Sequence, residues 1–157
     1  MKIHLLLALL ITLFALAPLT DPRPLQTHQG FAPLYNLQAI ERGDATKFDT
    51  GDTPLVMMVA RVFRALGFDE VSALKAVFGL AFLAGTIGVF GLARGMFGDE
   101  ASLVAASLFA LSPYRLATVY VRGSMGEALA LGLLPLAIWS AKALFARARF
   151  PSPPLVR

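Results

Sequence analysis

Residues 76–93 read AVFGLAFLAGTIGVFGLA, eighteen consecutive positions without Asp, Glu, Lys or Arg. As an α-helix, this stretch would be ~27 Å long, close to the ~30 Å hydrocarbon thickness of a bilayer. Residues 3–19 and 128–141 also lack these charges, whereas 20–75 carries thirteen of the twenty-four charged residues in the chain. A division into charge-free and charged blocks is typical of a membrane protein.

The composition indicates the same class of protein. Apolar residues make up 57% of the 157-residue chain and charged residues 15%, against ~25% in soluble domains. A soluble domain of this size could not bury so much apolar surface. The formal charge is +4, but the sequence has no basic stripe interleaved with aromatic residues, which argues against nucleic-acid binding. Because the chain has no cysteine, disulfides, thiolate metal sites and cysteine nucleophiles are excluded.

Four segments are predicted to span the membrane, at about 3–19, 76–93, 101–120 and 124–145. We therefore expect an all-α integral membrane domain over residues 1–146, multi-pass in a bacterial inner or plasma membrane. Residues 147–157 are expected to form a cytoplasmic tail or a truncated linker.

Short signals refine these spans. Ala15-Leu16-Ala17 resembles a signal-peptidase site, but Pro18 would follow the cut, which favours an uncleaved signal anchor over a cleaved signal peptide. Pro113 is expected to interrupt the third span at Ser112, and Pro135 to kink the fourth. Small residues in the second span predict close helix–helix packing. These are Gly79, Gly85, Gly88 and Gly91.

Basic residues indicate the orientation. If the spans alternate in direction, five of these residues fall on one side, which the positive-inside rule makes cytoplasmic. They are Lys2, Arg94, Lys142, Arg147 and Arg149. Residues 20–75 and 113–123 would then face outward.

The outer loop 20–75 is predicted to contain two amphipathic interfacial helices. One begins at Thr53-Pro54, an N-cap followed by proline, and stops at Gly67. The other is expected from His28 to Arg42, with Gly43 as its stop. The apolar stripe of the first follows helical spacing and is predicted to lie in the membrane interface or on the ends of the spans. It consists of Leu55, Met58, Val59, Val62, Phe63 and Leu66.

Three groups of loop residues are candidates for chemistry. Asp21 follows the first span directly, and a carboxylate held there can serve as a general base; the alternative is a solvated turn residue before Pro22. His28 is a candidate metal ligand or acid–base group, with a helix-start or interface histidine as the alternative. An acidic turn could supply oxygen ligands to a divalent metal ion. The alternative is that its acids are solvated turn residues. That turn contains Asp44, Asp49 and Asp52.

The segment 112–127 concentrates polar and aromatic side chains at the predicted outer boundary. Arg guanidinium groups match phosphate oxygens, so a lipid-linked phosphate is one interpretation. Interface anchoring by Tyr and Arg, together with a capping box formed by Ser124 and Glu127, is the other. A glutamate this close to an apolar span needs a partner, and Arg122 is the nearest candidate. The cluster comprises Tyr114, Arg115, Tyr120, Arg122 and Glu127.

Three segments, which together extend over roughly residues 3–145, resemble a known family. They are Asp21 to Asp44 with His28; Gly51-Asp52-Thr53-Pro54-Leu55 with the helix ending Leu66-Gly67; and Ser112-Pro113-Tyr114-Arg115 with Tyr120-Val121-Arg122-Gly123, Glu127 and Pro135. On these residues the chain resembles membrane proteins with the GT-C glycosyltransferase fold, in particular the YfhO-type proteins and the membrane domain of 6-pyruvoyl-tetrahydropterin synthase-related proteins. The third segment is the most specific.

The resemblance implies transfer of a sugar from a polyprenyl-phosphate-linked donor at the outer membrane face. It implies that Asp21 is the catalytic base, although Pro22 stands where many relatives have a second acid. Because GT-C enzymes generally have more spans, the chain is expected to be an N-terminal part that further C-terminal spans or a partner subunit completes. The implied substrate-binding residues are Arg115, Arg122, Tyr114, Tyr120, Glu127 and His28.

Two other functions stay open from the sequence. A non-catalytic membrane scaffold or assembly subunit agrees with the short chain and with the absence of a paired acid. Transport is a weaker alternative, because the only ionisable residue near the interior of a span is Glu127, which lies near an end.

Overall fold

The computed structural model of the chain describes residues 2–24, 26–27, 31–43 and 54–149, with the last four described by their backbone alone. Every regular element in this described part is helical. The elements in chain order are α1 (Lys2–Leu16), η1 (Ala17–Thr20), α2 (Ala32–Glu41), α3 (Pro54–Ala65), α4 (Glu70–Phe97), α5 (Asp99–Ala110), α6 (Pro113–Ala117), η3 (Thr118–Arg122) and α7 (Met125–Arg149).

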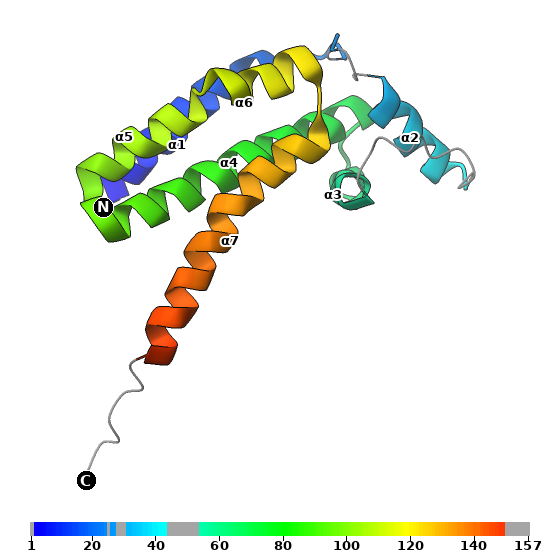
Figure 1. The fold of residues 1–157 in the computed structure, drawn as a ribbon. Coiled ribbons are helices and arrows are strands. Elements are labelled where there is room, and N and C mark those ends of the chain that lie inside the picture. Colours follow the sequence, from blue (N-terminus) through cyan, green and yellow to red (C-terminus); the bar gives the residue numbers. More distant parts are fainter. Residues whose placement is uncertain (1, 25, 28–30, 44–53, 150–157) are drawn as a thin grey trace.

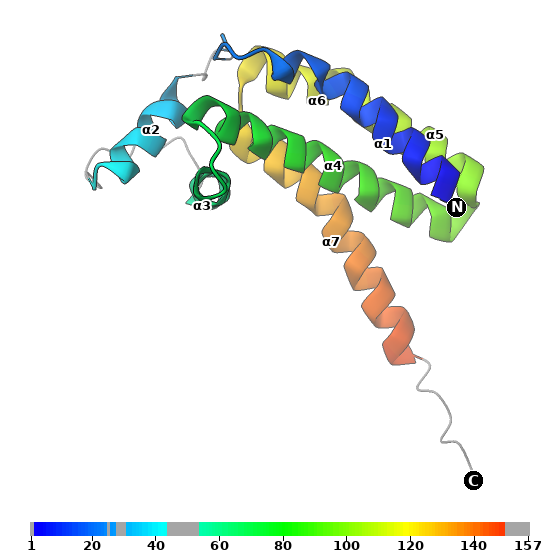
Figure 2. The same cartoon turned by 180° about the vertical axis from the view of Figure 1, so that it is seen from behind.

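α4 is the central helix of the bundle (Figure 1). It contacts α1 and α5, which lie side by side, and it packs most extensively against α7. Seen from both sides, α7 diverges from the other helices along its C-terminal half (Figure 2). We call the end of the bundle near α2 and α3 the loop end, and the opposite end, where α4 turns into α5, the turn end.

Four helical segments in the described part of the chain are long and apolar enough to cross a membrane. They are Lys2–Thr20, Glu70–Phe97, Asp99–Arg122 and Met125–Phe145. The sequence-based prediction of four such helices, at nearly these places, is confirmed. The largest difference is at the second, which begins six residues earlier than predicted because Asp69 caps it: the Asp69 carboxylate accepts a hydrogen bond from the Ser72 amide at 3.1 Å.

Prolines and glycines set the breaks between these segments. Ser112 is extended, with φ −54° and ψ 126°, and Pro113 begins α6, so the predicted interruption of the third span is confirmed. The helical path then continues through η3 to Arg122 and ends at Gly123, which has the left-handed φ of 69°. α7 runs on past Pro135.

Glycine brings α4 and α7 into backbone contact. A Cβ atom at Gly132 of α7 would lie 2.9 Å from the Cα atom of Ala81 in α4. A Cβ atom at Gly88 would lie 2.7 Å from the carbonyl carbon of Pro135. Gly85 and Gly91 are equally tight, against Phe109 and Trp139, whereas Gly79 has no neighbour within 4 Å. The predicted close packing through glycine is thus present at three of the four positions of the second span.

α1 is tied to α4 in the bundle interior by two hydroxyl groups. The Thr12 and Thr86 hydroxyl oxygens are fully buried and lie 2.9 Å apart, so one donates a hydrogen bond to the other. Each oxygen also lies within hydrogen-bond distance of a carbonyl one turn earlier in its own helix, at Ala8 and Phe82. The pair is therefore satisfied without water.

Both predicted loop helices are present, and α2 is shorter than expected. Gly43 and Gly67, with φ of 76° and 93°, follow the helix ends as predicted. The residues of α3 that are buried are Val56, Met57 and Ala60. Of the predicted stripe, Val59 and Phe63 are half-buried, whereas Leu55, Met58, Val62 and Leu66 are exposed. α3 thus packs through the side chains next to the predicted stripe and leaves most of the stripe exposed, which agrees with a position in the membrane interface.

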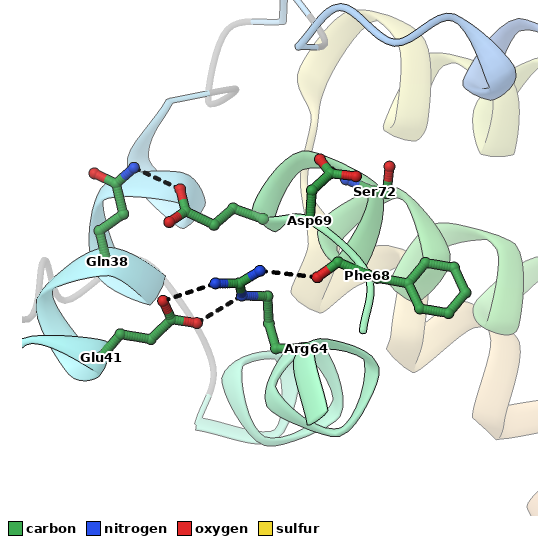
Figure 3. A network of polar contacts seen from close by, with 7 residues as sticks. Gln38, Glu41, Arg64, Phe68, Asp69 and Ser72 are labelled. Carbon is green, nitrogen blue, oxygen red and sulfur yellow. Dashed lines mark hydrogen bonds and ion pairs between the residues drawn. The ribbon is translucent and has the colours of Figure 1, made fainter. Parts of the chain in front are cut away.

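An ion pair and hydrogen bonds join α2, α3 and the start of α4 (Figure 3). The Arg64 guanidinium donates to both carboxylate oxygens of Glu41, at 2.7 and 3.1 Å, and to the Phe68 carbonyl at 2.8 Å. The Gln38 amide donates to Glu70 at 2.6 Å. A bidentate Arg–carboxylate pair fixes direction as well as distance, so it orients α2 on α3.

The Glu41–Arg64 pair predicts an acid-sensitive loop end. The Arg64 hydrogen bond lowers the pKa of Glu41 below its ordinary 4.5. A carboxyl group whose pKa is lower in the folded state stabilises that state above about pH 4.5, and this contribution is lost as the pH falls through the lowered value. We therefore expect the thermal midpoint of the native protein in detergent to fall more steeply between pH 5 and pH 3 than that of Glu41→Gln. Parallel curves for the two proteins would show that the pair contributes nothing.

Candidate functional site

Asp21 lies at the loop end, immediately after η1, and is exposed. Its carboxylate accepts a hydrogen bond from the Arg23 amide at 2.9 Å, which forms a local turn before the outer loop. The second carboxylate oxygen has no described partner, so the group is oriented by the turn and remains accessible.

Lys75 fixes the backbone of this turn. Its side chain reaches from the second turn of α4, where the residue is buried, and its ammonium donates to the carbonyl of Asp21 and, at 2.6 Å, to that of Arg23. Two backbone carbonyls thereby solvate a cation that would otherwise be costly to bury. The sequence marked Lys75 only as the border of a span, and nothing in its local pattern pointed to this contact.

Three predicted site residues form one cluster where η3 meets α7. Arg122 pairs with Glu127, with Nη1 2.9 Å from one carboxylate oxygen and 3.0 Å from the other. The Tyr114 hydroxyl donates to the same carboxylate. The expected partner of Glu127 is therefore confirmed as Arg122. The Arg122 side chain is 51% exposed and that of Glu127 23% exposed, so the pair lies at the surface.

Two contacts bring the chain on either side of Asp21 against η3 and Gly123. The Tyr120 hydroxyl donates to the Ala15 carbonyl at 2.6 Å, at the end of α1. The side chain of Thr27 lies against Gly123, where an added Cβ atom would be 2.8 Å from the Thr27 Cβ atom. The chain on either side of Asp21 is therefore packed on η3 and on the residue that follows it.

Arg115 lies apart from the surface cluster, inside the bundle. It is 3% exposed, and its guanidinium carbon lies 4.1 Å from the ring centre of Phe82 and 4.3 Å from that of Phe109. Nη2 donates to the Ala81 carbonyl at 3.2 Å, and the buried Nη1 has no hydrogen-bond partner among the described residues. The two arginines that the sequence grouped together thus have different environments.

The remaining predicted residues lie outside the described part of the chain. They are His28 and the acidic turn of Asp44, Asp49 and Asp52. Within the described ranges, no group of three or more His, Asp or Glu side chains is arranged to hold a metal ion.

Comparisons of the chain with protein-family models, with curated proteins and with solved structures found no match.

Proposed function

We propose that the four apolar helices span a bilayer, with the loop end outside the cell. Large apolar side chains project from the outer surfaces of α1, α5 and α7, where lipid would solvate them and water would not. Examples are Phe14, Leu108 and Leu134, which are 78%, 68% and 60% exposed. Residues 20–75 and 113–127 carry eight bases and eight acids, so the net positive charge comes from the rest of the sequence. Of the bases outside these two ranges, Arg94 and Lys142 lie at the turn end, which the anionic cytoplasmic leaflet would attract.

We propose that the chain is the N-terminal part of a GT-C-like membrane glycosyltransferase that uses a polyprenyl-phosphate-linked sugar at the outer face. The observation that supports this most is a pair of contacts: Tyr120 with Ala15 and Gly123 with Thr27, on either side of Asp21. The accessible, oriented carboxylate of Asp21 and the exposed guanidinium of Arg122 therefore belong to segments that meet at the loop end.

The residues fit the bond changes of such a transfer. The acceptor oxygen forms a bond to the anomeric carbon of the sugar while the bond from that carbon to the phosphate oxygen breaks, releasing polyprenyl phosphate. Asp21 accepts the proton that the acceptor hydroxyl loses. Arg122 interacts with the negative charge that develops on the leaving phosphate, in exchange for part of its contact with Glu127.

Substitution of Asp21 tests the proposal in the full-length protein. Asp21→Asn keeps the shape of the side chain and can still accept the hydrogen bond from Arg23, but it cannot take up a proton. With polyprenyl-phosphate-linked hexoses as donors in native membranes, we expect release of polyprenyl phosphate to slow by roughly 10²-fold or more.

The matched control is Glu100→Gln, which removes an exposed acid at the turn end and is expected to leave the rate unchanged. Because the chain has no cysteine, single cysteines at Phe31 and Glu100 can report orientation with a membrane-impermeant maleimide. Undiminished transfer by Asp21→Asn, or labelling of position 100 but not 31 from outside, would show that the assignment is wrong.

A non-catalytic scaffold or assembly subunit is the second candidate, and specific contacts favour it. Arg122 is already neutralised by Glu127, and Arg115 is turned into the bundle, away from any donor phosphate at the surface. A scaffold needs these residues only for folding. Donor turnover that is absent in the wild-type full-length protein, together with a co-purifying partner that Asp21→Asn retains, would favour the scaffold.

A further inference from the structure

A groove at the turn end is independent of the loop-end site. It lies where α7 diverges from α4, beside the start of α1, and its volume is about 670 Å³. That volume falls within the ~300–1,000 Å³ range of ligand sites. The walls are apolar and come from three helices, with Leu5 from α1, Ile87 and Phe90 from α4, and Trp139 from α7.

Two glycines of α4 shape the groove: Gly95 keeps it open, and Gly91 lets the Trp139 ring pack on α4. A Cβ atom at Gly95 would meet no backbone and only the Lys142 ammonium, at 3.4 Å. Gly91, one turn earlier, lies directly beneath the Trp139 ring. The absence of a side chain at Gly95 therefore leaves space next to the apolar wall that Trp139 forms, and such a space suits a hydrocarbon chain.

The mouth of the groove is basic. Arg94 lines it, and the contact of Lys142 with Gly95 places a second cation beside it. Asp99 also lines the groove, and its carboxylate accepts a hydrogen bond from Nε of Arg94 at 2.6 Å. This ion pair offsets the negative charge of Asp99, and the Arg94 side chain remains 44% exposed. Lys142 is exposed, and no described carboxylate is paired with it.

We propose that this groove binds one anionic phospholipid from the leaflet at the turn end. One acyl chain lies between α4 and α7 against Phe90 and Trp139, and the headgroup phosphate lies between Arg94 and Lys142. A further apolar helix would fill the groove without using either cation, whereas an anionic phospholipid satisfies both the apolar walls and the basic mouth. Basic pockets between membrane helices on the cytoplasmic side favour such headgroups.

Trp139 is the only tryptophan in the chain and lines the groove, so its fluorescence reports occupancy directly. The full chain is reconstituted with brominated phosphatidylglycerol or brominated phosphatidylcholine of the same acyl chains, each titrated into unlabelled phosphatidylcholine. We expect phosphatidylglycerol to reach half-maximal quenching at a roughly tenfold lower mole fraction, because each base near an anionic headgroup adds several-fold to the affinity.

Three variants separate the proposal from its alternatives. Lys142→Gln, whose side chain has no described ion pair to lose, is expected to reduce the headgroup preference several-fold. Gly95→Leu fills the groove and is expected to lower quenching by both lipids. Arg61→Gln, which removes an exposed base at the loop end, should change neither. Equal quenching by the two lipids in the wild type would overturn the proposal, as would a dimer in which Trp139 is protected from both.

Discussion

Gly132→Ala is expected to destabilise the bundle, although alanine is the better helix former. The added methyl group would lie 2.9 Å from the Cα atom of Ala81 and closer still to the carbonyl of that residue, so α4 and α7 must separate. Overpacking of this kind costs ~1–3 kcal/mol when side chains can shift, and here the obstacle is backbone. We therefore expect a loss at the upper end of that range, measured as the midpoint of unfolding by SDS in mixed micelles.

Gly79→Ala is the matched control for this experiment. It is the same chemical change in the partner helix, at a glycine with no neighbour within 4 Å. Without a clash, only the helix propensity remains, and alanine is favoured by up to ~1 kcal/mol. Opposite signs for the two substitutions are therefore the expected result. A Gly132→Ala protein as stable as Gly79→Ala would mean that the two helices do not meet at this seam.

The sequence predicted the helices well because their signals are local. Charge-free runs, a proline at 113 and glycines at 43 and 67 each act within one or two turns, and the structure has helices and breaks where these signals place them. The Arg122–Glu127 pair was also predictable, since its members are five residues apart at one boundary.

The contacts that assemble the loop end were not predictable in this way. Lys75 and Asp21 are 54 residues apart, and Tyr120 and Ala15 are 105 apart, so no local period connects them. The face of α3 that packs on the bundle was not predictable either. The periodic pattern finds the apolar stripe, most of which stays exposed, whereas Val56, Met57 and Ala60 beside it are buried.

Arg115 shows most clearly where local sequence is insufficient, because an arginine near a membrane boundary is ordinarily expected to reach the surface. The structure places it under two aromatic rings with one buried Nη that has no described partner. A buried cation without a carboxylate bears a desolvation penalty that its contacts only partly offset. The cation–π contacts are worth up to ~2 kcal/mol each, and the hydrogen bond to Ala81 is long at 3.2 Å.

Arg115→Met is accordingly expected to leave the protein at least as stable as the wild type, with a gain of up to ~4 kcal/mol. Methionine fills much of the same space and keeps contact with both rings, but brings no charge. Arg115→Ala is the comparison, since it removes the charge and leaves a void. We expect its stability to be well below that of Arg115→Met. SDS unfolding midpoints of the three proteins distinguish the cases. If Arg115→Met unfolds as readily as Arg115→Ala, the guanidinium itself holds α6 on α4. If Arg115→Met is at least as stable as the wild type, the arginine at this position must serve a role other than folding.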